Sequence, residues 1–372
     1  MRDILGSLRE WYADGRPFGL ASVVAVSHSA PRQPGAAMAV GPGGEAVGSV
    51  SGGCVEGAVY ELATEVLRTD EPVLQSYGYS DADAFEVGLT CGGTVTVFVQ
   101  ALERDRFPQF GEVLESVELR EPVALATLVN GAELGQRLAI WPDRTAGTLG
   151  NAGLDAAVTD DARGMLEHGT TGERRYGPTG QRRRDEVTVF VECYAPPPRM
   201  LVFGAIDFAA AMARLGTFLG YHVTVCDARA IFATRRRFPH ADEVVVEWPH
   251  RYLARTTVDE RTVICVLTHD PKFDVPLLEI ALRTPAGYVG AMGSRRTHDE
   301  RLARLREVGV TDPELARLRS PIGLDLGART PEETAVAIAA EIVAERWGGS
   351  GRPLGGTAGA IHRAPPEPAR HR

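Results

Sequence analysis

The sequence lacks any long uninterrupted run of apolar residues. No such run in its 372 residues approaches the roughly 18 that a membrane-spanning helix needs, so we expect no membrane span. The segment at the N-terminus carries charges where a secretory signal needs an apolar core. These absences lead us to expect a cytoplasmic protein.

Cysteine is scarce, and no Cys-x-x-Cys pair occurs among the five cysteines. This argues against a disulfide framework and against a structural zinc site, so we expect reduced thiols and no metal ligands. Cys193, Cys226 and Cys265 lie in predicted strands, where a thiol usually serves as a small packing residue.

An excess of basic residues is also absent. Lys and Arg number 40 against 49 Asp and Glu, which gives a formal charge of -9. Nucleic-acid-binding proteins normally carry a basic domain or patch, so we expect no nucleic-acid partner. A small anionic ligand stays compatible with this balance, because a few local arginines suffice to bind one.

The chain divides at three consecutive prolines, 196–198, which lack amide donors and favour an extended connection. We predict an N-terminal domain over residues 1–197 and a second domain over residues 198–347. Residues 348–372 are rich in Gly, Pro, Ala and Arg without periodicity, which predicts a disordered tail. No internal repeat of fixed period is visible.

The N-terminal half predicts a mixed α/β domain. Residues 145–184 give no clear pattern. Helices are expected at 4–13, 55–66 and 104–118, and strands at 19–26, 37–40, 46–50, 94–99, 122–129, 136–141 and 186–191.

The C-terminal half alternates apolar strands with helical segments from residue 200 onward. This alternation predicts an α/β fold, a Rossmann-like doubly wound parallel sheet with right-handed crossovers. Ligands bind such sheets at the carboxyl ends of the strands.

The first candidate site is Ser51-Gly52-Gly53-Cys54, directly before a predicted helix. Glycine amides and a helix N-terminus attract anions and stabilise a thiolate, so Cys54 is a candidate reactive thiol or ligand contact. The alternative is a glycine turn followed by a small buried residue. Local sequence alone leaves both open.

Two further segments of this half could join the same pocket. Cys91-Gly92-Gly93 mirrors the first motif, although for this motif taken alone a bulge with a buried cysteine is the favoured explanation. Arg32 lies between two prolines in a stiff loop, where it could present its guanidinium to a phosphate or oxo group. The alternative for Arg32 is a solvated turn residue.

In the second half, Gly204 follows a strand and Asp227 ends the next one, as in dinucleotide-binding folds. Ile206 occupies the position of the second glycine and Asp207 adds negative charge beside it. Both features oppose pyrophosphate binding, so we expect Rossmann architecture without NAD binding.

Two other strand ends carry polar residues. His269-Asp270 offers acid, base and hydrogen-bonding groups, although Asp270 could simply cap a helix. Arg295-Arg296 precedes a helix and could bind phosphate. The alternative for these arginines is a solvated surface position.

Several of these segments, in this order along the chain, resemble the XdhC/CoxI family of accessory factors for molybdenum hydroxylases such as xanthine dehydrogenase. The matching segments are 29–35, 48–57, 88–93, 267–270, 293–296 and 321–325. The family usually has Gly-Ala-Gly-His at the Rossmann turn, whereas this chain has Gly204-Ala205-Ile206-Asp207.

The resemblance implies a maturation factor and cofactor-binding chaperone rather than a stand-alone enzyme. Such a factor binds the molybdenum cofactor (molybdopterin) transiently, supports its sulfuration and delivers it to an apo-hydroxylase. A cysteine desulfurase is the implied sulfur donor. The family's two glycine-flanked cysteines fall on Cys54 and Cys91.

Two other functions stay open. One is an NAD(P)-dependent oxidoreductase. The other is a degenerate scaffold that binds the hydroxylase without the cofactor. The sequence also leaves open whether the chain forms a homodimer.

Overall fold

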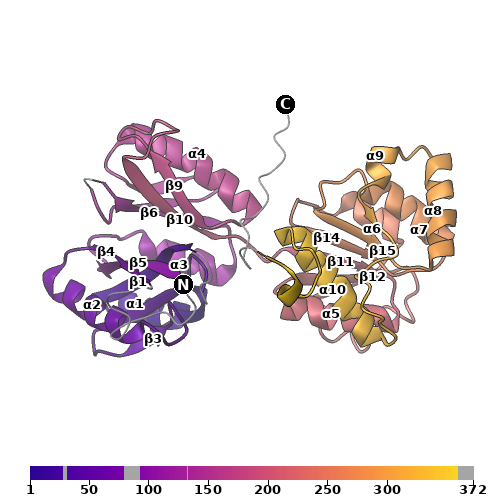
Figure 1. The fold of residues 1–372 in the computed structure, drawn as a ribbon, viewed down its shortest axis with the longest axis horizontal. Coiled ribbons are helices and arrows are strands. Elements are labelled where there is room, and N and C mark those ends of the chain that lie inside the picture. The colour runs from indigo at the N-terminus through magenta and orange to yellow at the C-terminus, as the bar shows by residue number, and fades with distance from the viewer. Residues whose placement is uncertain (28–31, 79–92, 132, 359–372) are drawn as a thin grey trace. The chain divides into compact units, whose positions relative to one another are not determined.

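The computed structural model describes residues 1–27, 32–78, 93–131 and 133–358. They form two compact units, one comprising Met1–Pro196 and the other beginning at Pro197 (Figure 1). The predicted fold class, a mixed α/β domain followed by a Rossmann-like one, is confirmed. None of the helices in these ranges has the length and apolar character needed to cross a membrane.

The first unit contains two five-stranded antiparallel sheets with the same strand order. They run β3-β2-β1-β5-β4 and β8-β7-β6-β10-β9. In the first half the elements are β1 (Phe18–Ser27), β2 (Ala37–Val40), β3 (Ala46–Gly48), α2 (Glu56–Thr69), β4 (Val73–Tyr77) and β5 (Thr94–Leu102). In the second half they are β6 (Val123–Asn130), β7 (Arg137–Ile140), β8 (Thr145–Thr148), α4 (Ala152–His168), β9 (Gly172–Tyr176) and β10 (Val187–Tyr194).

The two halves are a structural repeat, which the sequence analysis missed. Leu20 pairs with Ala39 between β1 and β2, and Leu125 pairs with Ala139 at the matching place between β6 and β7. The period is not fixed, because the connection from β1 to β2 is longer than that from β6 to β7. A search for a constant spacing therefore cannot detect the repeat.

The core of this unit lies on both faces of each sheet. Helix α2 packs against one face of the first sheet, and α4 packs against one face of the second. The opposite faces share a core with α1 (Leu5–Ala13) and α3 (Phe110–Leu119). Helix α3 begins later than predicted, since Pro108 disfavours helical geometry in the residue before it. Helix α4, in the segment without a clear pattern, was not predicted.

The second unit is a six-stranded parallel sheet of order β13-β12-β11-β14-β15-β16. One face is covered by α5 and α10 and the other by α6, α7 and α8. The short elements α6, α9 and β16 were not predicted. The elements are β11 (Arg199–Phe203), α5 (Asp207–Phe218), β12 (His222–Asp227), β13 (Glu243–Val246), α6 (Pro249–Arg255), β14 (Val263–Val266), α7 (Pro271–Ala281), β15 (Tyr288–Ala291), α8 (Arg295–Glu307), α9 (Asp312–Leu315), β16 (Leu318–Arg319) and α10 (Pro331–Trp347).

Candidate functional site

Cys54 lies on a short loop between β3 and α2, two residues before the helix begins. Val55, which follows it, is buried and anchors the loop to the core under α2. Gly52 and Gly53 have φ values of 79° and 121°, a region that L side chains adopt at a cost. Among the described cysteines Cys54 alone is exposed. The loop therefore presents this thiol to solvent.

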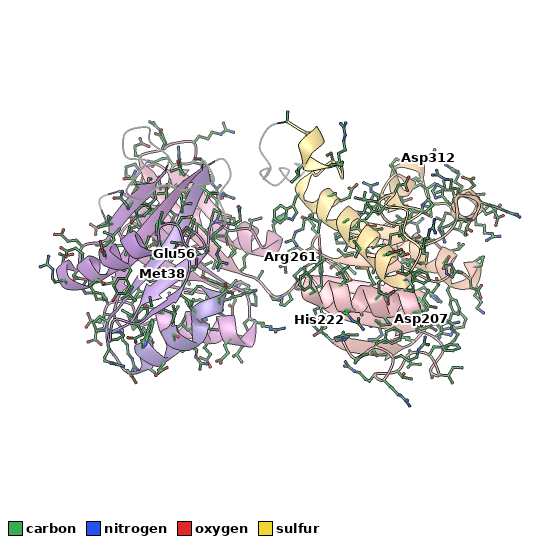
Figure 2. The ribbon with its side chains drawn as sticks, turned by 60° about the horizontal axis from the view of Figure 1, so that its bottom comes forward. Met38, Glu56, Asp207, His222, Arg261 and Asp312 are labelled. Carbon is green, nitrogen blue, oxygen red and sulfur yellow. The ribbon has the colours of Figure 1, made fainter. Side chains whose placement is uncertain are left out.

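The carboxylate of Glu56, the first residue of α2 and labelled in Figure 2, holds this loop. Its Oε1 accepts hydrogen bonds from the amides of Ser51 at 2.9 Å and Gly52 at 3.0 Å. Its Oε2 accepts one from the amide of Gly53 at 2.8 Å. The Ser49 hydroxyl donates to Oε1 and the Ser51 hydroxyl donates to Oε2, each at 2.6 Å. The chain's own carboxylate thus occupies the concave backbone of the loop.

This arrangement corrects the expected role of the glycine amides. Partial burial alone would raise the pKa of Glu56, but the hydroxyls of Ser49 and Ser51 and the loop amides outweigh it and lower that pKa to about 2. The amides of Gly52 and Gly53, predicted to receive a ligand anion, therefore already bind an internal one. The sequence did offer a signal, an acidic residue directly after the loop at a helix N-terminus.

The second half of the unit has an equivalent loop, also held by a carboxylate of the helix that follows, but this loop has no cysteine. Thr148 donates its hydroxyl to Asp155 Oδ2 at 2.7 Å, and the Leu149 amide donates to Oδ1 at 2.7 Å. Asp155 lies in the first turn of α4, as Glu56 lies in that of α2. Both halves thus contain what we call an acidic latch, a carboxylate in the first turn of a helix that accepts hydrogen bonds from the preceding loop. Only the loop of the first half also carries a cysteine.

We predict that Glu56→Gln loosens the Cys54 loop. A glutamine keeps one acceptor oxygen, but its amide nitrogen cannot accept from Gly53. The free energy of unfolding should fall by about 1–2 kcal/mol at neutral pH, since water competes for a carboxylate that is partly exposed. Because the pKa of Glu56 is lowered in the folded state, its stabilisation is complete above its unfolded pKa and disappears as the pH falls toward 2.

Hydrogen exchange is the direct measurement of this effect. The amides of Gly52 and Gly53 should exchange faster in Glu56→Gln than in the wild type. Asp155→Asn is the matched control, because it loosens the equivalent loop and should leave these two amides unchanged. Equal exchange rates at Gly52 and Gly53 in the wild type and Glu56→Gln would contradict the latch.

The other predicted residues of the first unit do not extend this site. Cys91 and Gly92 lie outside the described residues, so their convergence with Cys54 stays a prediction. Gly93 is buried directly before β5. Arg32 is 38% exposed in its side chain and lies 3.3 Å from Asp3 Oδ2, as its alternative interpretation as a solvated turn residue expects.

The remaining described cysteines are poor nucleophiles. Burial raises the pKa of Cys193, Cys226 and Cys265 to about 12 in each case. Cys226 and Cys265 are buried in the parallel sheet, as predicted, and Cys193 is half-buried on β10.

In the second unit, Gly204 follows β11, and Asp227 ends the neighbouring strand β12. The strand order of the sheet reverses on the other side of β11, between β11 and β14. Gly204 has φ +113°, and a Cβ there would lie 3.1 Å from the backbone of Leu267 and Thr268, so only glycine fits. Asp207, labelled in Figure 2, opens α5 a few residues beyond this turn. Gly204 and Asp227 therefore lie at the carboxyl edge of the parallel sheet, and ligand binding at this edge stays a prediction.

Asp227, however, is already saturated. It accepts from the Ala205 amide at 2.7 Å and from Nε and Nη2 of the Arg229 guanidinium, at 2.9 and 2.7 Å. Burial would raise the pKa of Asp227, but these bonds outweigh it and lower that pKa. A carboxylate with these partners has little capacity left for a ribose hydroxyl, and the absence of NAD binding stays a prediction.

The other polar residues at this edge have ordinary structural partners. His269 is exposed after β14. Asp270 caps α7 through the Lys272 amide at 3.1 Å and pairs with the Lys272 ammonium at 2.9 Å. Arg296 pairs with Glu300 along α8 at 2.9 Å, and Arg295 is exposed beside it. Each of these positions fits the alternative interpretation, a helix cap or a solvated arginine.

Comparison with family models matches both units. A model described as the XdhC and CoxI family matches residues 11–78 and 116–177, one segment in each half of the first unit. A model described as the XdhC Rossmann domain matches residues 200–342. Together the matches include more than half of the chain.

Individual proteins match along most of their lengths. The chain is 28% identical to a molybdenum cofactor insertion chaperone, PaoD, of Escherichia coli, over 93% of this chain and 88% of that one. It is 27% identical to a probable xanthine dehydrogenase subunit of Bacillus subtilis, over 88% and 92%. A crystal structure described as a xanthine dehydrogenase from Bacillus halodurans has the same fold, with TM-score 0.68 and 23% identity over 96% and 98%.

Proposed function

We propose that this chain, which belongs to the XdhC and CoxI family, is a chaperone that takes part in maturation of the molybdenum cofactor for a hydroxylase of the xanthine dehydrogenase type. The observation that carries the proposal is the likeness to the cofactor insertion chaperone PaoD over 93% of this chain. The likeness spans both units, so it does not rest on the Rossmann domain alone.

The Cys54 loop supplies the chemistry that such a role requires. The molybdenum of this cofactor is bound by sulfur, and thiolate is the protein ligand that suits a soft, sulfur-bound metal centre. Cys54 is exposed on a loop that its neighbours hold in one conformation. Because Glu56 occupies the loop amides, we assign to Cys54 a contact with the metal end of the cofactor rather than with its phosphate.

The finer parts of the role are proposals that follow from the family resemblance. The chain would hold the cofactor transiently, support its sulfuration with sulfur from a cysteine desulfurase, and deliver it to the apo-hydroxylase in the cytoplasm. Cys91 would join Cys54 at the cofactor. His269, Arg295 and Arg296 are candidates for contacts with the cofactor or hydroxylase from the second unit.

The two alternatives have clear signatures. An NAD(P)-dependent oxidoreductase requires a free ribose-binding acid, and the saturation of Asp227 by Arg229 and Ala205 disfavours it. A scaffold without cofactor would bind the hydroxylase even when purified from cells that cannot make molybdopterin.

Mass spectrometry of the small molecules released by denaturation tests the proposal. Protein purified from molybdenum-replete cells should release molybdopterin or its nucleotide form, and protein from cells unable to make the pterin should not. Consistent absence of a pterin, together with stable binding of the apo-hydroxylase, would replace the chaperone with the scaffold.

A further inference from the structure

A cavity of about 420 Å³ lies between the two halves of the first unit, a size within the range of small-molecule sites. It is separate from the Cys54 loop, since the cavity lining contains no residue of that loop. The lining residues come from both halves: Asp70, Pro72, 100–103, 106–109, 134–137, Gly147 and Thr148.

Arg137, at the start of β7, is the buried charge of this lining. It is 6% exposed, and its Nε donates to Gln100 Oε1 at 3.0 Å. Its Nη1 has no hydrogen-bond acceptor among the residues that the structure describes. Burial lowers the pKa of Arg137 to about 10, although the negative charge of Glu192, itself buried on β10, opposes part of that effect. Arg137 therefore stays charged at neutral pH. A buried guanidinium with an unused donor is costly unless something accepts from it.

The internal repeat shows that the fold itself does not require an arginine here. Arg137 pairs with Thr127 across β7 and β6. The matching pair in the first half is Ala37 with Ser22, across β2 and β1. The equivalent register position is therefore filled by alanine in the first sheet and by a buried arginine in the second. Sheet packing alone leaves the arginine unexplained.

The other charges of the cavity are already paired. Arg106 forms ion pairs with both Asp70 and Glu103, so neither carboxylate needs Arg137. Within the described part of the chain, no carboxylate lies at ion-pair distance from Arg137. Pro72, Phe107 and Leu134 add apolar surface to the same lining. The cavity thus combines a buried cation that has one unused donor with patches of apolar surface in a lining that is otherwise mostly polar.

We propose that this cavity binds a small organic oxyanion, whose carboxylate or phosphate group accepts hydrogen bonds from the Arg137 guanidinium. The less polar body of the ligand would lie against Pro72, Phe107 and Leu134. Arginine suits either anionic group because its planar fork donates two parallel hydrogen bonds. This proposal does not depend on the molybdenum-cofactor role, so each of the two can be tested and rejected separately.

Calorimetric titration of the full chain with benzoate and with phenyl phosphate tests the proposal. Both probes carry an apolar ring, and the stronger one identifies the preferred anionic group. We expect saturable binding of at least one probe and a loss of about tenfold or more in affinity in Arg137→Ala. The repeat offers a precedent for alanine at this register.

A second variant keeps the test valid if Arg137→Ala does not fold. Gln136 is exposed at the cavity, and Gln136→Trp should obstruct it and weaken binding with the fold intact. Arg9→Gln is the control, since it removes an exposed cation of the same unit that pairs with Glu118. Absence of binding of both probes at about 10 mM, or equal binding by Gln136→Trp and wild type, would overturn the proposal.

Discussion

Replacing Cys54 by alanine is expected to lower the fraction of purified protein that carries molybdenum cofactor by about tenfold or more. Loss of residues that merely support metal ligands typically costs 10- to 100-fold in metal affinity, and loss of a direct thiolate contact should cost at least as much. Molybdenum content per chain, measured by elemental mass spectrometry, gives the occupancy.

Cys193→Ala is the matched control for this experiment. Cys193 belongs to the same unit, but burial raises the pKa of its thiol to about 12, so it should not serve as a ligand. The control should keep the wild-type molybdenum content. Cys54→Ala protein with wild-type content would remove the role assigned to this thiol, even if the chain were still a chaperone.

Replacing Arg301 by methionine is expected to destabilise the second unit by about 3–5 kcal/mol, because it leaves Asp274 buried and uncompensated. Arg301 and Asp274 are 3% and 4% exposed, and Arg301 Nη2 donates to Asp274 Oδ2 at 3.0 Å and to the Met292 carbonyl at 2.7 Å. Thr268 donates its hydroxyl to the same carboxylate. The network joins the ends of β14 and β15, so its loss should also disturb the ligand edge of the sheet.

The pH dependence of the Arg301→Met deficit gives a further test. Burial raises the pKa of Asp274, and Thr268 and Arg301 offset only part of that effect. Arg301→Met removes one of the groups that lower this pKa, so the folded variant binds the Asp274 proton more tightly than the folded wild type does. The deficit should therefore shrink as the pH falls through the further raised pKa of the variant.

Urea unfolding followed by circular dichroism measures the effect. Arg296→Met, which removes an exposed arginine of the same helix paired with Glu300, should change the free energy of unfolding by less than about 1 kcal/mol. A deficit in Arg301→Met no larger than in this control would contradict the importance of the buried pair.

Sequence patterns predicted the second unit well and the first unit less well. Alternating apolar strands and helices fix a parallel sheet, because each strand is buried on both faces and leaves a continuous apolar run. The sequence did not predict α4 because the large apolar residues of its buried face, which include Leu154 and Val158, are few among alanine, glycine and aspartate. The sequence did not show the repeat because equivalent positions of the two halves have similar side chains and the same strand pairing, but mostly not the same residue.

At the candidate site, sequence located the groups but not their partners. The Gly-Gly-Cys pattern left open whether Cys54 is a ligand contact or a small buried residue, and the structure shows its thiol exposed before α2. It could not show that Glu56 fills the loop, or that Arg229 saturates Asp227, because both depend on side-chain directions that only the folded chain defines. Whether Cys91 approaches Cys54 stays a prediction from the motif alone.

We propose that the molybdenum cofactor contacts this chain at Cys54. Anomalous diffraction at the molybdenum edge, from crystals of the cofactor-loaded protein, locates the metal directly. We expect one molybdenum peak in contact with the Cys54 sulfur. A peak remote from Cys54 in crystals with full molybdenum content would contradict it.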